Sequence, residues 1–238
     1  MSITKVIDVT LTAPASSGLA LAQQTAGAAN LVLNGTLIVG GKFTVADVVY
    51  IDLVRATQGC PKKINLTTTE DDSLVNATVT GTLSKDGPSF SETIALGSTA
   101  TVTTVNYFYS VTNIAVDGAI GADMHVGTSQ LAESPIVFPD YTPGAKSVSV
   151  EITSGTCNVT LQHTFDPFFD YQNTPGYNQS MVAWNNNDAN TPLVGLTTGT
   201  TNAAYISQIR GLRLITASYS STPRIKLRVA MSSRGSDS

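Results

Sequence analysis

Apolar and polar residues alternate in short segments along most of the chain, and this period of two predicts β-strands. In one such segment Ile64 and Leu66 share a face, with polar residues between and around them. The predicted strands of the first half are 48–54, 63–67, 74–83, 89–96, 107–116 and 123–127. No segment has a convincing helical period, so we expect no long helix. Frequent short strands separated by turn signals predict an all-β fold made of sandwiches or barrels.

The clearest local motif is a β-hairpin in the first half. Strands 74–83 and 89–96 flank Lys85-Asp86-Gly87-Pro88, which is a strong signal for a tight turn. The next strand, 107–116, changes the parity of its apolar residues between Val111 and Ile114. Such a change predicts a β-bulge or a kink between these two residues.

The second half carries two further hairpin patterns separated by a loop-rich stretch from 166 to 201. Each pattern places a turn signal between two apolar-alternating segments. The predicted hairpins are strands 147–152 and 156–164 around Ser154-Gly155, and strands 209–218 and 224–231 around residues 220–223.

Prolines divide the chain near its middle. Pro135, Pro139 and Pro143 fall close together, and proline lacks the amide hydrogen that a central strand needs. We therefore predict a linker over 131–143, an N-terminal β domain at 1–131 and a C-terminal β-sandwich domain at 132–238. The first 47 residues are weakly patterned, and an extended N-terminal arm that reaches a neighbouring subunit is one interpretation of them.

The composition of the 238 residues is 42% hydrophobic but only 13% charged, with a net charge of −4. Ser, Thr, Asn and Gly replace the missing charge. This balance disfavours nucleic acid as a partner, because nucleic-acid binding needs a basic stripe. The basic residues of the C-terminal third are interpreted as solvating strand faces or meeting an acidic patch on a partner. They are Arg210, Arg213, Arg224, Lys226, Arg228 and Arg234.

Two cysteines, Cys60 and Cys157, fall one in each predicted domain. We interpret them as unpaired thiols of a protein folded in a reducing cytosol rather than as a disulfide. The N-terminus lacks the pattern of a signal peptide, and no apolar run approaches the roughly 20 residues that span a bilayer. We therefore expect synthesis in the cytoplasm and no membrane partner.

Groups that could carry out nucleophilic catalysis are few. Cys157 and His163 lie six residues apart on one predicted strand, which separates them by roughly 20 Å if the strand is straight. A pairing of Cys60 with His125 stays open, although nothing in the sequence around Cys60 resembles an activated thiolate site. These four residues do not predict an enzyme.

The carboxylates Asp166 and Asp170 flank an aromatic pair in the loop-rich stretch. They could bind a hard cation or act as the acid/base pair of a glycosidase, but an ordinary turn is the favoured interpretation. The sequence contains no phosphate-binding loop, nucleophile elbow, metal-spaced His/Cys cluster or dinucleotide fingerprint. We predict no enzymatic activity, no catalytic residues, no cofactor and no metal.

Aromatic residues are the remaining candidates for function. They are dense in two places, 107–109 and 165–171, with Trp184 close to the second. Alternate members of an extended segment face outward, and exposed aromatic residues anchor protein interfaces. Filling of the core is an equal alternative for the first patch. The candidate interface residues are Tyr107, Tyr109, Phe168, Phe169, Tyr171 and Trp184.

Several of these segments resemble the Thr/Gly-rich β domains of tailed-bacteriophage structural proteins. The segments that carry the resemblance are Val79-Thr80-Gly81-Thr82, Asp86-Gly87 and Glu92-Thr93-Ile94, then 106–116 and 126–128, and in the second half 148–152, 159–167 and 209–214. The resemblance covers about residues 60–231. The sequence departs from the pattern in the Asn-rich insertion around 172–192 and in the first 47 residues. The resemblance implies no catalytic residues.

The resemblance implies a non-catalytic virion component that forms a symmetric homo-oligomer on the capsid or at the head–tail junction, as a decoration, collar or connector protein. Its expected partners are copies of itself and other virion proteins, such as major capsid, portal or tail proteins. A second hypothesis is a host- or carbohydrate-binding module of a tail fibre or surface adhesin, in which the aromatic and Asn-rich loop at 165–190 stacks on sugars. A glycan hydrolase that uses Asp166 and Asp170 is a third.

Overall fold

The computed structural model describes residues 2–52, 54–56, 59–139, 146–166, 182–186, 193–205 and 209–232. In these residues all regular structure is β-strand, which confirms the predicted all-β class. The strands are β1 (Ser2–Thr10), β2 (Ala20–Thr25), β3 (Ala29–Asn30), β4 (Ile38–Val39), β5 (Lys42–Thr44), β6 (Val48–Ile51), β7 (Val54–Ala56), β8 (Lys62–Thr68), β9 (Asn76–Thr82), β10 (Ser89–Ala95), β11 (Thr101–Thr103), β12 (Ser110–Val116), β13 (Ile120–Ala132), β14 (Lys146–Thr164), β15 (Asn185–Asn186), β16 (Gly199–Tyr205) and β17 (Gly211–Ser232).

Two antiparallel sheets enclose one hydrophobic cluster and form a sandwich. Their strand orders are β11-β8-β13-β2 and β10-β9-β12-β5-β4, with β3 also paired to β12. Ile64 and Met124 enter the cluster from the first sheet, and Val79 and Ile114 enter it from the second. These side chains alternate with outward polar residues, as the period of two predicts. We call this unit the sandwich.

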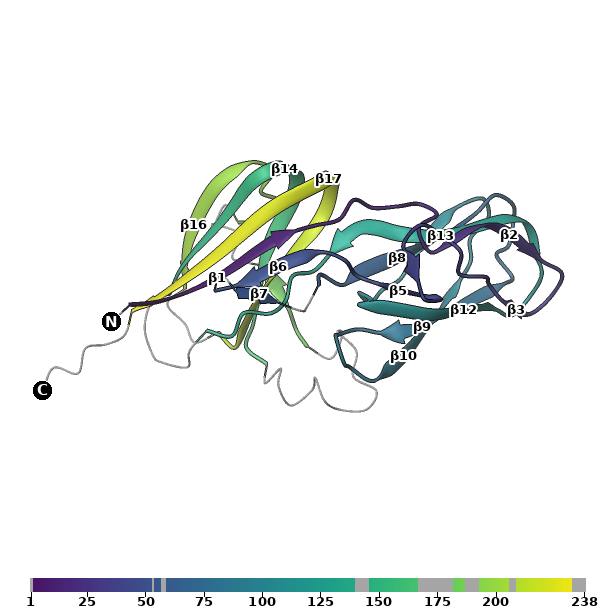
Figure 1. Ribbon diagram of the computed structural model, residues 1–238, viewed down its shortest axis with the longest axis horizontal. Helices are drawn as coiled ribbons and strands as arrows, with labels where there is room; N and C mark the ends of the chain where they lie inside the picture. The colour runs from purple at the N-terminus through teal and green to yellow at the C-terminus, as the bar shows by residue number, and fades with distance from the viewer. Residues whose placement is uncertain are drawn as a thin grey trace, which may run out of the picture.

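A third sheet lies at the opposite end of the elongated molecule (Figure 1). Its strand order is β15-β14-β17-β1-β6-β7, and β16 also pairs with β14. It supplies most of a second hydrophobic cluster, which includes Val9, Val150, Leu161 and Leu227. We call this unit the ribbon sheet, because the long pair β14 and β17 forms most of it.

The N-terminal segment is integrated into the ribbon sheet. β1 lies between β17 and β6, with Ser2 opposite Ser232 and Thr10 opposite both Arg224 and Val48. This central position differs from the extended arm that the weak pattern of the first 47 residues allowed. Consequently the sequence-based division at 131/132 does not separate the sheets, because β1, β6 and β7 all pair within the ribbon sheet.

The first predicted hairpin is confirmed. β9 and β10 pair from Asn76↔Ala95 to Thr82↔Ser89. The predicted irregularity in the following strand is also confirmed, because the register between β12 and β9 shifts between Val111 and Asn113. Gly81 lies at this bulge, where an added Cβ would be 1.8 Å from the carbonyl oxygen of Ser110. Only glycine fits the close approach of the two backbones.

The two hairpins predicted for the second half are wrong. β14 and β17 each continue through their turn signal and pair with one another from Lys146↔Met231 to Thr164↔Gly211. The two turn signals lie opposite each other where the register shifts on both sides of Ser154, and residues 221–223 of β17 face Gly155 alone. Gly155 and Ser221 both have a positive φ. The turn residues therefore bend a long ribbon instead of reversing the chain.

β13 is longer than the short strand predicted at 123–127, and it links the two units. It begins against β2 and β8 in the sandwich and ends where Ala132 pairs with Lys62. The predicted linker then continues the pairing, through bridges of Glu133 with Ile215 and of Val137 with Leu212. The described part of this segment is thus held against the ribbon sheet.

Candidate functional site

Two of the candidate interface residues, Tyr107 and Tyr109, are half-buried beside the sandwich. The ammonium group of Lys63 lies 5.1 Å from the ring centroid of Tyr107. Burial, reinforced by the charge of Glu133, raises the pKa of Tyr107 to about 12. Tyr109 packs against the sandwich cluster. Each ring therefore gives only part of its surface to solvent.

Trp184, also half-buried, forms a cation–π contact with Arg213, whose guanidinium carbon lies 4.2 Å from the ring centroid. Arg213 is itself buried and bonds to the carboxylate of Glu133 at 2.5 Å and to the amide oxygen of Gln162 at 2.9 Å. The Glu133–Arg213 pair also acts electrostatically on Tyr107. The structure therefore brings two of the predicted aromatic residues to one buried ion pair.

The other three candidate interface residues, Phe168, Phe169 and Tyr171, lie outside the described residues.

Four of the six basic residues of the C-terminal third have acidic partners inside the chain, namely Arg213, Arg224, Lys226 and Arg228, and Arg234 lies outside the described residues. Asp8 of β1 accepts two hydrogen bonds from Arg224 and lies 3.5 Å from the ammonium group of Lys226. Arg228 pairs with Glu151 of β14 at 2.7 Å. These side chains are partly exposed, and their ion pairs join neighbouring strands of the ribbon sheet.

The cysteine–histidine candidates lack activated thiols. Cys60 and Cys157 are both free and buried. Burial raises the pKa of Cys157 to about 11 and that of Cys60 well above its ordinary value, so both thiols are protonated at neutral pH. His163 contacts the ring of Phe165 edge-on, and desolvation lowers its pKa. His125 lies opposite Thr67 on the sandwich sheet.

The carboxylate candidates are not gathered into a cation site in the part of the chain that the structure describes. Asp166 accepts a hydrogen bond from the backbone amide of Ala183 at 2.6 Å, as in an ordinary loop, and Asp170 lies outside the described residues. Among the described residues no three His, Cys, Asp or Glu side chains are grouped to hold a metal ion.

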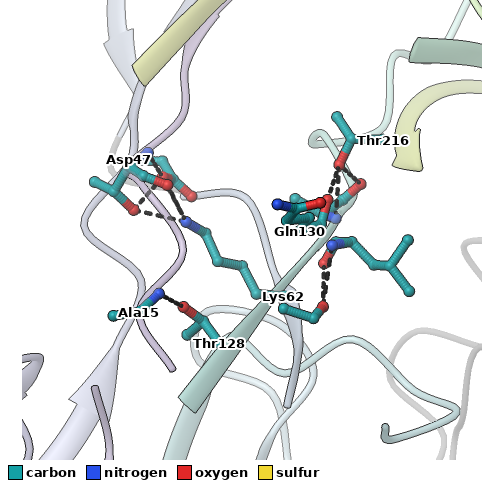
Figure 2. A network of polar contacts seen from close by, with 10 residues as sticks. Ala15, Asp47, Lys62, Thr128, Gln130 and Thr216 are labelled. Carbon is teal, nitrogen blue, oxygen red and sulfur yellow. Dashed lines mark hydrogen bonds and ion pairs between the residues drawn. The ribbon is translucent and has the colours of Figure 1, made fainter. Parts of the chain in front are cut away.

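A buried polar cluster lies where the sandwich meets the ribbon sheet, and the sequence did not reveal it (Figure 2). We call it the polar junction. Its residues are Thr12, Asp47, Lys62, Thr128, Gln130 and Thr216. Its centre is an ion pair between Lys62 at the start of β8 and Asp47 just before β6, with 2% and 0% of the two side chains exposed.

The rest of the polar junction fixes the C-terminal part of β13. Thr128 accepts a hydrogen bond from the backbone amide of Ala15 at 3.1 Å. At the end of the strand the hydroxyl of Thr216 in β17 donates to the carbonyl of Gln130 and accepts from the amide of Ala132. Because these bonds satisfy buried backbone groups, they hold the two units in one arrangement.

The strand edges that the sheets leave open are the surfaces best suited to binding another protein. Among the described residues β10 pairs only with β9, and β16 pairs only with β14. The sequence of β16, Gly-Thr-Thr-Asn-Ala-Ala-Tyr, carries no charge. Next to the β10 edge, pairs of hydroxyl groups cross between strands, with Thr78 bonded to Thr93 and Thr80 to Ser91. Uncharged open edges can accept a further strand through main-chain hydrogen bonds.

No protein-family model matches the sequence, and the curated proteins contain no significant match to it. Within the part of the chain that the structure describes, no helix is long and apolar enough to cross a membrane.

Proposed function

We propose that this protein is a non-catalytic structural component of a tailed-phage virion, which assembles as a symmetric homo-oligomer on the capsid or at the head–tail junction. The observation that carries the structural role is the open, uncharged edge strand β16. In the described interior, the buried Cys60 thiol is protonated and the buried Lys62 is paired with Asp47. The virion assignment rests on the resemblance of the β9–β10 hairpin, and of the segments that follow it, to the Thr/Gly-rich β domains of tailed-bacteriophage structural proteins.

The physical basis of assembly is strand pairing at the edges. An edge strand presents unpaired amide and carbonyl groups, and natural monomers usually protect such edges with lysine, proline or a covering loop. β16 has none of these residues in its seven positions. Repetition of one modest contact by symmetry gives a stable ring or lattice.

The carbohydrate-binding alternative receives less support from the described residues. A sugar stacks on an aromatic ring whose face is open to solvent. One face of Trp184 is instead covered by the guanidinium group of Arg213.

The proposal is tested by searching purified virions for this chain. Tailed-phage particles made by a host that carries the gene are purified, and their proteins are quantified by mass spectrometry against the major capsid protein. We expect the chain in a fixed, symmetry-related number of copies per particle, and antibodies against it to label the head or neck. Its absence from intact particles, while it accumulates in the lysate, would refute the virion role.

A further inference from the structure

The buried ion pair of the polar junction places an amine beside a carboxyl group in an almost dry environment. The ammonium nitrogen of Lys62 is 3.3 Å from Oδ1 of Asp47. The centroid of the Tyr219 ring lies 5.6 Å from the same nitrogen. The charges of Asp47 and Lys62 both act on the pKa of the buried Cys60 thiol. A buried ion pair is costly, because its mutual attraction offsets the loss of hydration only in part.

Thr12 holds both partners of the pair. Its backbone amide and its hydroxyl both donate to Oδ1 of Asp47, at 2.5 Å and 2.8 Å. Its carbonyl and its hydroxyl oxygen accept from the ammonium group of Lys62, at 2.8 Å and 2.6 Å (Figure 2). The amine and the carboxyl group are thus fixed next to each other by one residue.

The two carboxylate oxygens of Asp47 differ sharply. Oδ1 accepts the two hydrogen bonds from Thr12, whereas the buried Oδ2 has no hydrogen-bond partner in the described part of the chain. An unsatisfied buried oxygen costs free energy and calls for a specific explanation.

We propose that Lys62 and Asp47 condense into an intramolecular isopeptide bond. A bond forms between Nζ of Lys62 and Cγ of Asp47, and the bond from Cγ to Oδ2 breaks. Two of the three ammonium protons leave with Oδ2 as one water molecule, and the third stays on the amide nitrogen. Atoms and charge balance with no oxidant, reductant or further reactant, because an ion pair becomes a neutral amide and water.

The geometry favours this direction of reaction. The two Thr12 donors point at Oδ1, which is where negative charge develops when Cγ becomes tetrahedral, so they act as an oxyanion hole. The hydroxyl of Thr12 accepts a hydrogen bond from the amine and donates one to Oδ1, so it holds the two reacting groups against each other.

The test is the mass of the intact wild-type chain. The folded protein is incubated at neutral pH, denatured and measured by mass spectrometry. We expect a mass below that of the sequence by one water molecule. Trypsin should then release a branched peptide in which residues 43–55 are joined through Asp47 to residues 56–63 through Lys62. A chain that keeps its full sequence mass after prolonged incubation would overturn the proposal.

Matched variants separate this bond from other losses of water. Lys62→Arg keeps a cation that can pair with Asp47 but cannot form the amide, so it should have its full sequence mass, whereas Lys63→Arg should still lose one water. Asp-Gly sequences such as Asp86-Gly87 and Asp117-Gly118 can lose water by forming a succinimide. A water loss that maps to those sites, with no branched peptide, would overturn the proposal as well.

Discussion

The sandwich and the ribbon sheet are both antiparallel β-structures, but they use different polar interactions between strands. On the sandwich, exposed hydroxyl pairs such as Thr80 with Ser91 cross between strands. On the ribbon sheet, Asp8 lies between the side chains of Arg224 and Lys226. The hydroxyl pair joins residues 11 positions apart in the sequence, whereas the bond of Asp8 to Arg224 joins residues more than 200 positions apart. Local sequence therefore determines more of the sandwich than of the ribbon sheet, and salt and pH should act mainly on the latter.

The largest effect is expected where two backbones of the sandwich touch. Gly81→Ala would place a Cβ 1.8 Å from the carbonyl oxygen of Ser110, so β9 and β12 must separate. We expect the free energy of unfolding to fall by about 3 kcal/mol or more. Gly27→Ala is the matched control, because nothing lies within 4 Å of its added Cβ. Equal denaturant midpoints for the two variants would contradict the tight pairing at the bulge.

A smaller effect is expected at the bend of the ribbon sheet. Gly155 has a φ of +74°, and an added Cβ would lie 2.8 Å from Cα of Pro223. Gly155→Ala should therefore cost about 2 kcal/mol or more, through backbone strain and a clash. Gly199→Ala has a similar φ of +77° with open space around it, so it should cost only about 1 kcal/mol. Chemical denaturation followed by circular dichroism measures both. If the chain formed two hairpins at this point instead of one continuous ribbon, Gly155→Ala would not cost more than Gly199→Ala.

The ion pairs of the ribbon sheet predict a dependence on pH. Hydrogen bonds and charge from Arg224 lower the pKa of Asp8 in the folded protein. The resulting stabilisation is present above the pKa of the unfolded chain and is lost as the pH falls through the lowered pKa. Asp8→Asn should cost about 1 kcal/mol at pH 7, because Arg224 is half-exposed, and the difference from the wild type should vanish in strong acid.

Thermal denaturation between pH 7 and pH 2 measures this difference. The control is Asp86→Asn at the exposed β9–β10 turn of the sandwich, which should leave stability nearly unchanged. A pH-independent deficit in Asp8→Asn would mean that the charge of Asp8 is not what stabilises the ribbon sheet.

The smallest effect is expected at the hydroxyl pairs. Thr80→Val keeps the shape of the side chain and removes the bond to Ser91 on an exposed face. The expected cost is below about 0.5 kcal/mol, and it should not change with added salt. Urea titrations at low and high salt test this. A salt-dependent loss would erase the contrast between the two sheets.

The parts of the fold that were predictable from sequence depend on neighbours in the chain. The β9–β10 hairpin follows from a tight turn between two alternating segments, and the β12 bulge follows from a change of parity within one segment. The turn signals at Ser154-Gly155 and at 220–223 look the same locally. They lie opposite each other within one ribbon only because β14 and β17 pair along their whole length, and no local pattern contains that information.

The polar junction was missed for a similar reason, although one signal was available. Lys62 has the same parity as Ile64 and Leu66, so a strand extended by one residue would have placed its side chain inward. An inward lysine requires a buried partner. Neither Asp47 nor Thr12 shows from sequence that it meets this lysine, because their approach depends on how the ribbon sheet packs beside the sandwich.

We propose that the open, uncharged edge of β16 joins copies of this chain, and the molar mass in solution tests this most directly. Light scattering of the purified wild-type protein over a range of concentrations should give the molar mass of an oligomer, which is two or more times the 24.8 kDa of one chain. Lysines at the exposed edge positions, in Thr200→Lys with Asn202→Lys, should lower that mass without changing the circular dichroism spectrum. Leu74→Lys, an exposed position away from this edge, should leave the mass unchanged. A wild-type protein that stays monomeric at every concentration would contradict the claim.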